Sequence, residues 1–141
     1  MPLLSGIDHC HINVNNLSNA VAWYEKVLGF KVVEELAFWD ETGKGPLTLQ
    51  DQNTTTRLAL FEGQVRSKGI AFGATGEQFI AWLAHFKSMD IKTVLADHGV
   101  TFSIYFKDES DNSHEITSHD YEHIKMFYPS VEQGSHSAKK S

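Results

Sequence analysis

The same order of predicted elements occurs twice along the chain, and this repeat restricts the fold more than any other feature. Each half of the sequence predicts a strand, a helix and three more strands, with a period of about sixty residues. The two modules cover about residues 5–62 and 67–118. One copy cannot bury the apolar face of its own sheet, so two copies have to pair. We therefore expect an α+β fold in which two βαβββ modules form a curled mixed sheet around a cavity.

The first module shows both periodicities. Residues 7–14 alternate in character, which predicts a strand. Apolar residues at helical spacing then predict a helix from Leu17 to Leu28, and Gly29 is a natural stop for it. Three more strands are expected at residues 30–37, 46–50 and 55–62.

The second module repeats this order. A short strand is expected at residues 69–74, and Thr75 with Gln78 resembles a capping box that begins the next helix. Further strands are expected at residues 91–95, 101–107 and 113–118. Aromatic residues at helical spacing are expected in the core: Trp23, Phe79, Trp82 and Phe86.

The length of 141 residues fits one domain with a core that needs no covalent staple. We expect residues 1–120 to form this domain and residues 121–141 to form a C-terminal extension. The extension is mixed in character up to Tyr128, which favours a short helix. From Glu132 onward it is polar, which predicts disorder.

Composition and charge exclude several functional classes. Cys10 is the only cysteine, so no intramolecular disulfide can form, and a reducing compartment is favoured. The N-terminus does not resemble a signal peptide, and no stretch approaches the ~20 apolar residues of a membrane helix. We therefore expect a cytoplasmic protein without a membrane partner. The net charge of −6 argues against a nucleic-acid partner, which would need clustered Lys and Arg.

Chemistry-bearing residues gather on the first and last predicted strands. Side chains two apart on a strand share a face, so His9 and His11 project together. Glu115 and Thr117 share a face in the last strand. If the sheets curl around a cavity, the two histidines and Glu115 converge, and two imidazoles with one carboxylate are the ligand set of many open catalytic metal sites.

Several segments then resemble a known family. The first half carries Ile7-Asp8-His9, Val14-Asn15-Asn16-Leu17, Trp23-Tyr24 and Val27-Leu28-Gly29-Phe30, and the second half carries Tyr105-Phe106-Lys107-Asp108 followed by Asn112 and Glu115. These motifs resemble the vicinal oxygen chelate superfamily, which includes glyoxalases, extradiol ring-cleaving dioxygenases, fosfomycin-resistance proteins and bleomycin-binding proteins. The resemblance covers about residues 5–118 and implies a glyoxalase-like fold. Glu109 and Asp111 stand where the family turn has Pro and Gly.

The resemblance implies a metal site in which some of the family's ligands are replaced by other residues. His9 and Glu115 stand at two ligand positions of the family. Gly69 replaces the usual third ligand, a histidine, and Ala59 stands where glyoxalase I has a glutamate. A divalent ion (Fe, Ni, Mn, Co or Zn) would therefore need His11 as its third ligand. Without metal, Glu115 could instead pair with His9 or with Arg57.

Other residues are candidates for substrate contacts. Arg57 could clamp a carboxylate or phosphate, or it could be a solvated strand arginine. Tyr105 and His11 are candidates for proton transfer, although Tyr105 could merely pack. The remaining predicted substrate contacts are Ser103, Thr117 and His98, of which His98 lies in a loop and could be solvated. Cys10 is expected in the core rather than as a nucleophile, and His114, His119 and His123 are expected at the surface.

Two functions remain open from the sequence. The first is an enzyme, a metal-assisted lyase or isomerase that acts on a small oxygenated metabolite through His9 and Glu115. The second is a metal-free protein of the bleomycin-resistance type that binds an antibiotic or metabolite, and Gly69 favours it by opening space. In both cases we expect a homodimer whose partner molecule is a small ligand.

Overall fold

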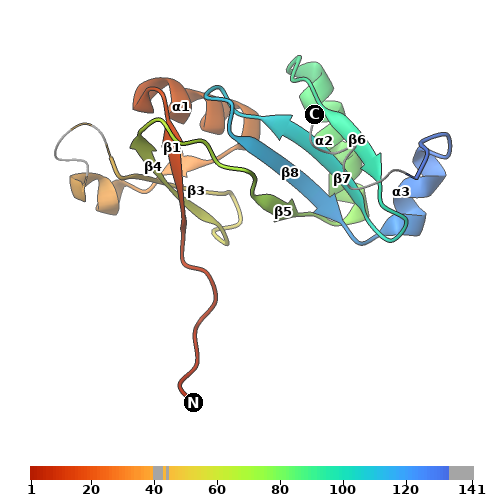
Figure 1. The fold of residues 1–141 in the computed structure, drawn as a ribbon, viewed down its shortest axis with the longest axis horizontal. Helices are drawn as coiled ribbons and strands as arrows, with labels where there is room; N and C mark the ends of the chain where they lie inside the picture. The colour runs from red at the N-terminus through yellow and green to blue at the C-terminus, as the bar shows by residue number, and fades with distance from the viewer. Residues whose placement is uncertain (40–42, 44, 134–141) are drawn as a thin grey trace. The chain divides into compact units, whose positions relative to one another are not determined.

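The computed structural model describes residues 1–39, 43 and 45–133, and its elements follow the predicted order (Figure 1). The disorder expected from Glu132 onward falls mainly on residues 134–141, which lie outside the described residues. The chain forms two compact units. The first comprises Met1–Ser67 with Asp108–Asn112, and the second comprises Lys68–Lys107 with Ser113–Ser141.

The first unit contains a four-stranded mixed sheet. Its elements are β1 (Cys10–Val14), α1 (Leu17–Trp23), η1 (Tyr24–Leu28), β2 (Lys31–Val32), η2 (Glu34–Trp39), β3 (Leu47–Gln50) and β4 (Arg57–Glu62). The strand order is β1-β4-β3-β2, with β1 parallel to β4 and the other pairs antiparallel. One sheet face and the helix form the core, which includes Ile12, Val14, Leu49, Leu58, Leu60, Ala20 and Val27.

The first helical segment consists of the α-helix α1 and the π-helical turn η1, which follows it directly. The Asn16 side chain accepts a hydrogen bond from the Asn19 backbone N–H and begins α1. From Tyr24 the chain continues as the wider π-helical turn η1. Gly29 then ends the helix at φ 75°, in the left-handed region, so the predicted stop at this glycine is confirmed.

The strand predicted at residues 30–37 is mostly wrong. Only β2 pairs with β3, through Lys31 with Gln50 and Val32 with Leu49. The following residues form the 3₁₀ helix η2 instead. Its segment Glu34-Glu35-Leu36-Ala37 consists of strong helix formers, and this local preference wins where β pairing ends.

The second unit repeats the arrangement. Its elements are β5 (Ala71–Gly73), α2 (Gly76–Ser88), β6 (Val94–Asp97), β7 (Phe102–Lys107), β8 (Ser113–Ser118) and α3 (Tyr121–Phe127). The strand order is β5-β8-β7-β6, with β5 parallel to β8. The Thr75 side chain accepts from the Gln78 backbone N–H at 3.2 Å, so the predicted helix start is confirmed. The core includes Phe79, Phe86, Phe102, Ile104, Phe106, Ile116 and Ile124.

Two details of the second unit differ from the prediction. The strand expected at 91–95 begins only at Val94, because the Ile91 N–H donates to Phe86 O and closes the end of α2. His114 was expected at the surface but is buried, with its ring between the rings of Phe72 and Phe106. Its ring makes tilted contacts with both phenyl rings, and alternation along the strand does not reveal that this face is covered.

Each unit is therefore an α+β module of helix and mixed sheet, which confirms the predicted fold class. The expectation of a cavity around which the sheets curl stays a prediction. Phe79 and Phe86 are buried as expected, whereas Trp23, Trp82 and Cys10 are only half-buried. None of the helices in the described part of the chain has the length and apolar character needed to cross a membrane.

Candidate functional site

In the first unit, the two predicted histidines meet on the open face of the sheet. Along β1, Ile12 and Val14 point into the core, so His11 projects from the opposite face. His9 directly precedes the strand and is exposed. The Nε2 atoms of His9 and His11 lie 3.0 Å apart. The structure thus brings these two residues together.

This spacing can be compared with that of two ligands on one metal ion. Metal–nitrogen bonds of about 2.0–2.1 Å at angles between 90° and tetrahedral separate the nitrogens by about 2.8–3.4 Å. The His9–His11 distance of 3.0 Å falls in this range. Within residues 1–39, 43 and 45–133, no three His, Cys, Asp or Glu side chains gather closely enough to hold a metal ion. The described geometry therefore fits two imidazole ligands.

Arg57 lies on the same sheet face as His11. His11 is in register with Ala59 across the β1–β4 pair, and Arg57 is two residues before Ala59 in β4. Arg57 as a whole is half-buried. The pKa of Asp8 is lowered, mainly by the hydrogen bond from His9 and to a lesser extent by the electrostatic attraction of His9 and Arg57. The charge of Arg57 therefore acts on Asp8. One guanidinium and one carboxylate therefore lie near the two histidines.

Asp8 is the residue that the sequence analysis missed. Strict strand alternation places it opposite His9, but β1 begins only at Cys10, so the alternation does not apply. Its Oδ2 atom accepts a hydrogen bond from Nδ1 of His9 at 2.8 Å. The signal was present in the sequence as an aspartate directly beside a candidate metal-binding histidine.

In the second unit, hydrogen bonds join the predicted residues of β7 and β8. The register pairs Ser103 with Thr117 and Tyr105 with Glu115, so all four share one face. Ser103 Oγ donates to Glu115 Oε2 at 2.9 Å and lies 3.4 Å from Thr117 Oγ1. Ser103 is buried and Glu115 is half-buried. The carboxylate is thus fixed by a neighbour on its own sheet.

Tyr105 extends this network toward the loop after β6. Its hydroxyl lies 3.0 Å from Nε2 of His98, so the loop histidine also joins the network. Burial raises the pKa of Tyr105, and the negative charge of Glu115 adds to this effect. The phenol therefore keeps its proton at neutral pH and can donate it in a hydrogen bond.

Gly69 and Ala59, the two positions where the family resemblance expects further ligands, differ in backbone conformation and in burial. At Gly69 the backbone has φ +144°, which L-residues rarely adopt, and the nearest atom to an added Cβ is Ser113 O at 3.6 Å. A Cβ would make only an ordinary contact there, but the backbone conformation favours glycine. Ala59 is buried, with only 4% of its surface exposed, between its neighbours His11 and Thr48.

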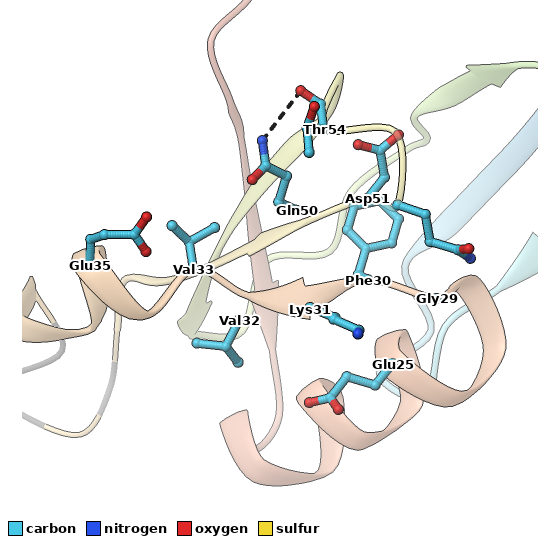
Figure 2. Close-up of a pocket in the computed structure, with 11 residues that line it drawn as sticks. Glu25, Gly29, Phe30, Lys31, Val32, Val33, Glu35, Gln50, Asp51 and Thr54 are labelled. Atoms are coloured by element: carbon cyan, nitrogen blue, oxygen red, sulfur yellow. Dashed lines mark hydrogen bonds between the residues drawn. The ribbon is translucent and has the colours of Figure 1, made fainter.

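The structure also contains a pocket that the sequence did not predict (Figure 2). It lies in the first unit, has a volume of about 650 Å³ and is formed by the end of η1, by β2 and by the turn after β3. Glu25, Glu35, Asp51 and Lys31 are among its lining residues. The described lining contains none of the residues predicted for the site, and its walls come from a helix end and a turn that carry no chemical motif.

Comparisons with known proteins agree on the fold. A family model described as Glyoxalase/Bleomycin resistance protein/Dioxygenase superfamily matches residues 6–116. No curated protein sequence matches the chain significantly.

Solved structures give the same result at low sequence identity. Lactoylglutathione lyase from Agrobacterium tumefaciens superposes with a TM-score of 0.70 at 20% identity, covering 84% of this chain and 97% of that one. The fosfomycin resistance protein FosX from Listeria monocytogenes, complexed with Mn(II) and sulfate, has a TM-score of 0.62 at 18% identity, covering 89% and 99%. A glyoxalase/dioxygenase from Nostoc punctiforme has a TM-score of 0.63 at 17% identity, covering 84% and 97%.

Proposed function

Because the chain belongs to the glyoxalase/bleomycin resistance protein/dioxygenase superfamily, we propose that it is a metal-assisted lyase or isomerase acting on a small oxygenated metabolite. The observation that carries this proposal is the 3.0 Å separation of the His9 and His11 Nε2 atoms on an open sheet face. These two residues would hold a divalent ion, and Glu115 is the carboxylate that the family resemblance adds to the set. When bound, such an ion supplies Lewis-acid polarisation of the substrate's adjacent oxygens.

The chain's own residues suggest how the substrate is held and protonated. Arg57 binds an anionic group of the substrate, since a guanidinium matches a carboxylate or phosphate with two parallel hydrogen bonds. Tyr105, which keeps its proton, donates it to a developing negative charge, and His98 supports it through its 3.0 Å contact with the hydroxyl. Ser103 and Thr117 offer hydroxyl groups on the same face for binding the substrate. His11 is the alternative proton carrier if it does not bind metal.

Metal content tests this proposal. The purified full chain is treated with chelator and titrated with Mn²⁺, Fe²⁺, Co²⁺, Ni²⁺ and Zn²⁺ by calorimetry, beginning with the Mn(II) found in FosX. We expect one ion per chain and an affinity at least tenfold weaker in His9→Ala. His119→Ala is the matched control, because His119 is exposed and lies beyond β8. A wild-type chain that binds none of these ions, or equal weakening in the control, would contradict the proposal.

A second function is favoured by one observation. Gly69 and Ala59 provide no donor at two family ligand positions, and the Gly69 backbone conformation disfavours any residue with a ligating side chain. This supports a metal-free protein that binds an antibiotic or metabolite. Native mass spectrometry of the purified chain distinguishes the two functions. A co-purified organic molecule in metal-free protein that does not bind added metal supports the second.

The same proposal includes a homodimer in the cytoplasm, because domains of this superfamily usually pair. Light scattering during size-exclusion chromatography measures the mass of the particle in solution. A mass near twice that of one chain supports the dimer, and a mass of one chain at micromolar concentration contradicts it.

A further inference from the structure

Three side chains at the start of the first unit form a continuous chain of contacts. Asp8 Oδ2 lies 2.8 Å from His9 Nδ1, and His9 Nε2 lies 3.0 Å from His11 Nε2. The side chain of Asp8 is 81% exposed and that of His9 is 40% exposed, so solvent and ligands reach both. The rings of His9 and His11 are tilted by 30°, with their centroids 4.9 Å apart. All three residues belong to the first unit.

The chemistry of the donors determines where the protons are. An ionised carboxylate only accepts hydrogen bonds, so His9 Nδ1 must carry a hydrogen to make the contact with Asp8. Neutral His9 then has a lone pair on Nε2, which can only accept. The contact with His11 therefore requires a hydrogen on Nε2 of His11. Neighbouring histidines thus hold opposite tautomers, and the Nε2 lone pair of His9 is directed at the Nε2–H of His11.

We infer that Asp8 is a positioning residue, which selects the His9 tautomer whose Nε2 lone pair is available to a metal ion. Carboxylates that accept from the remote nitrogen of a ligating histidine perform this task in many metal sites. In the free protein, the Nε2–H of His11 occupies the lone pair that the metal would take, and His11 would have to carry its hydrogen on Nδ1 instead for its own Nε2 to bind the same ion. The tautomer pair stands on the geometry alone, and its use for metal binding rests on the proposed function.

The exposure of Asp8 limits the size of the effect. An exposed charge-assisted contact contributes less than a buried one, because water competes for both partners. Loss of such an outer partner weakens metal binding by about 10- to 100-fold in general, and we expect about tenfold here. The change in tautomer population should be of similar size, and it does not depend on any metal.

The experiment reads the tautomers directly in the metal-free full chain. Long-range ¹H–¹⁵N correlation spectra of the histidine rings are recorded at pH 8, where a solvated imidazole is neutral. We expect His9 to be protonated at Nδ1 and His11 at Nε2. In Asp8→Asn, whose amide both donates and accepts, we expect His9 to change to a mixture of tautomers. Asp8→Glu, which keeps the carboxylate, should retain the Nδ1–H form.

His119 provides an internal control in the same spectra. It also lies beside an aspartate in the sequence, but Oδ2 of that residue, Asp120, accepts from the Gly76 backbone N–H at 2.6 Å. His119 should therefore keep one tautomer mixture in all three proteins. The inference is overturned if wild-type His9 is protonated at Nε2, if Asp8→Asn leaves its tautomer unchanged, or if Asp8→Glu also loses it.

Metal titration of the same variants separates this inference from the proposed function. A wild-type chain with the expected tautomers that binds no metal contradicts the proposed function and leaves the tautomer assignment intact. A chain that binds metal but keeps its affinity in Asp8→Asn overturns the positioning role.

Discussion

The open faces of the two sheets are built from equivalent strands, but they satisfy their polar groups in different ways. In the first unit, His9 and His11 are exposed and contact each other and Asp8. In the second unit, Glu115 is fixed by a buried serine, Ser103, through a 2.9 Å hydrogen bond. The first face thus offers accessible donors, while the second has its groups set before any ligand arrives.

Two buried aspartates, one in each unit, also differ in the donors that they bind. Asp108 belongs to the first unit and accepts from uncharged donors of Tyr24, Ser110 and Asn112. Asp97 belongs to the second unit and accepts from Lys125 as well as from Tyr121 and Gly99. Removing each carboxylate shows how far the two units differ in the energy of their polar contacts.

The largest effect is expected for Asp108→Ala. Its carboxylate accepts from Tyr24 Oη at 2.6 Å and from the backbone N–H groups of Ser110 and Asn112 at 2.9 Å. Tyr24 is fully buried, and stranding buried donors costs about 1–3 kcal/mol each. We expect a loss of about 3–5 kcal/mol in the free energy of unfolding, measured by urea titration. Asp111→Asn, in the same turn but exposed, should change it little. A loss below about 1 kcal/mol in Asp108→Ala would contradict this account.

A smaller loss is expected for Asp97→Ala. Asp97 is fully buried, but its partner Lys125 keeps 31% of its side chain exposed and can return to water. We expect a loss of about 2–3 kcal/mol, below the value for Asp108→Ala. Hydrogen exchange should quicken in α3, which carries Tyr121 and Lys125. Exchange that quickens equally in α2 would show that Asp97 does not act through α3.

Acid should weaken the contribution of Asp97 to the stability of the second unit. Burial opposes ionisation of Asp97, but hydrogen bonds from Gly99, Lys125 and Tyr121 outweigh it and lower the pKa of Asp97. A lowered folded-state pKa contributes stability that is present above the unfolded value of about 3.9 and is lost as pH falls through the folded value. The difference in urea midpoint between wild type and Asp97→Asn should therefore be constant from pH 7 to 5 and shrink toward pH 3. A difference that grows on acidification would contradict the lowered folded-state pKa of Asp97.

The smallest effects are expected at the two helix ends. The left-handed position after the helix is Gly29 (φ 75°) in the first unit and Asp90 (φ 57°) in the second. Gly29→Ala should destabilise by about 1 kcal/mol, since a Cβ is strained there and would also displace the side-chain amide of Gln52. Asp90→Gly should stabilise by roughly 0.5 kcal/mol, because it relieves the same strain. Thermal unfolding should show a lower melting temperature for Gly29→Ala and a higher one for Asp90→Gly. A change in the same direction in both variants would contradict this account.

Much of the fold could be predicted because its signals are local. The stop at Gly29 and the cap at Thr75 each depend on atoms within a few residues, and the structure confirms both. The failure at residues 34–39 has a local cause as well, because strong helix formers follow the strand and β pairing does not extend over them.

The candidate site was predictable only in part. His9 and His11 lie together as expected, although His9 precedes β1, and Glu115 and Thr117 share a face of β8 as alternation predicts. Asp8 was missed, because the residue before a strand does not obey the strand's alternation. The pocket beside β2 was missed because its walls come from three separate segments with no shared motif.

Residue order alone is enough to establish the duplicated βαβββ pattern, the helix ends and the residues that share a strand face. These depend on backbone sterics and on periods of 2 and 3.6 residues, which any short segment carries. The burial of His114, the hydrogen bond between Ser103 and Glu115 and the anchoring of Asp97 by Lys125 required the folded chain. Each joins residues from neighbouring strands or from a strand and a distant helix. The energy of such contacts depends on the loss of water around both partners, and that happens only when the sheet and helices have packed.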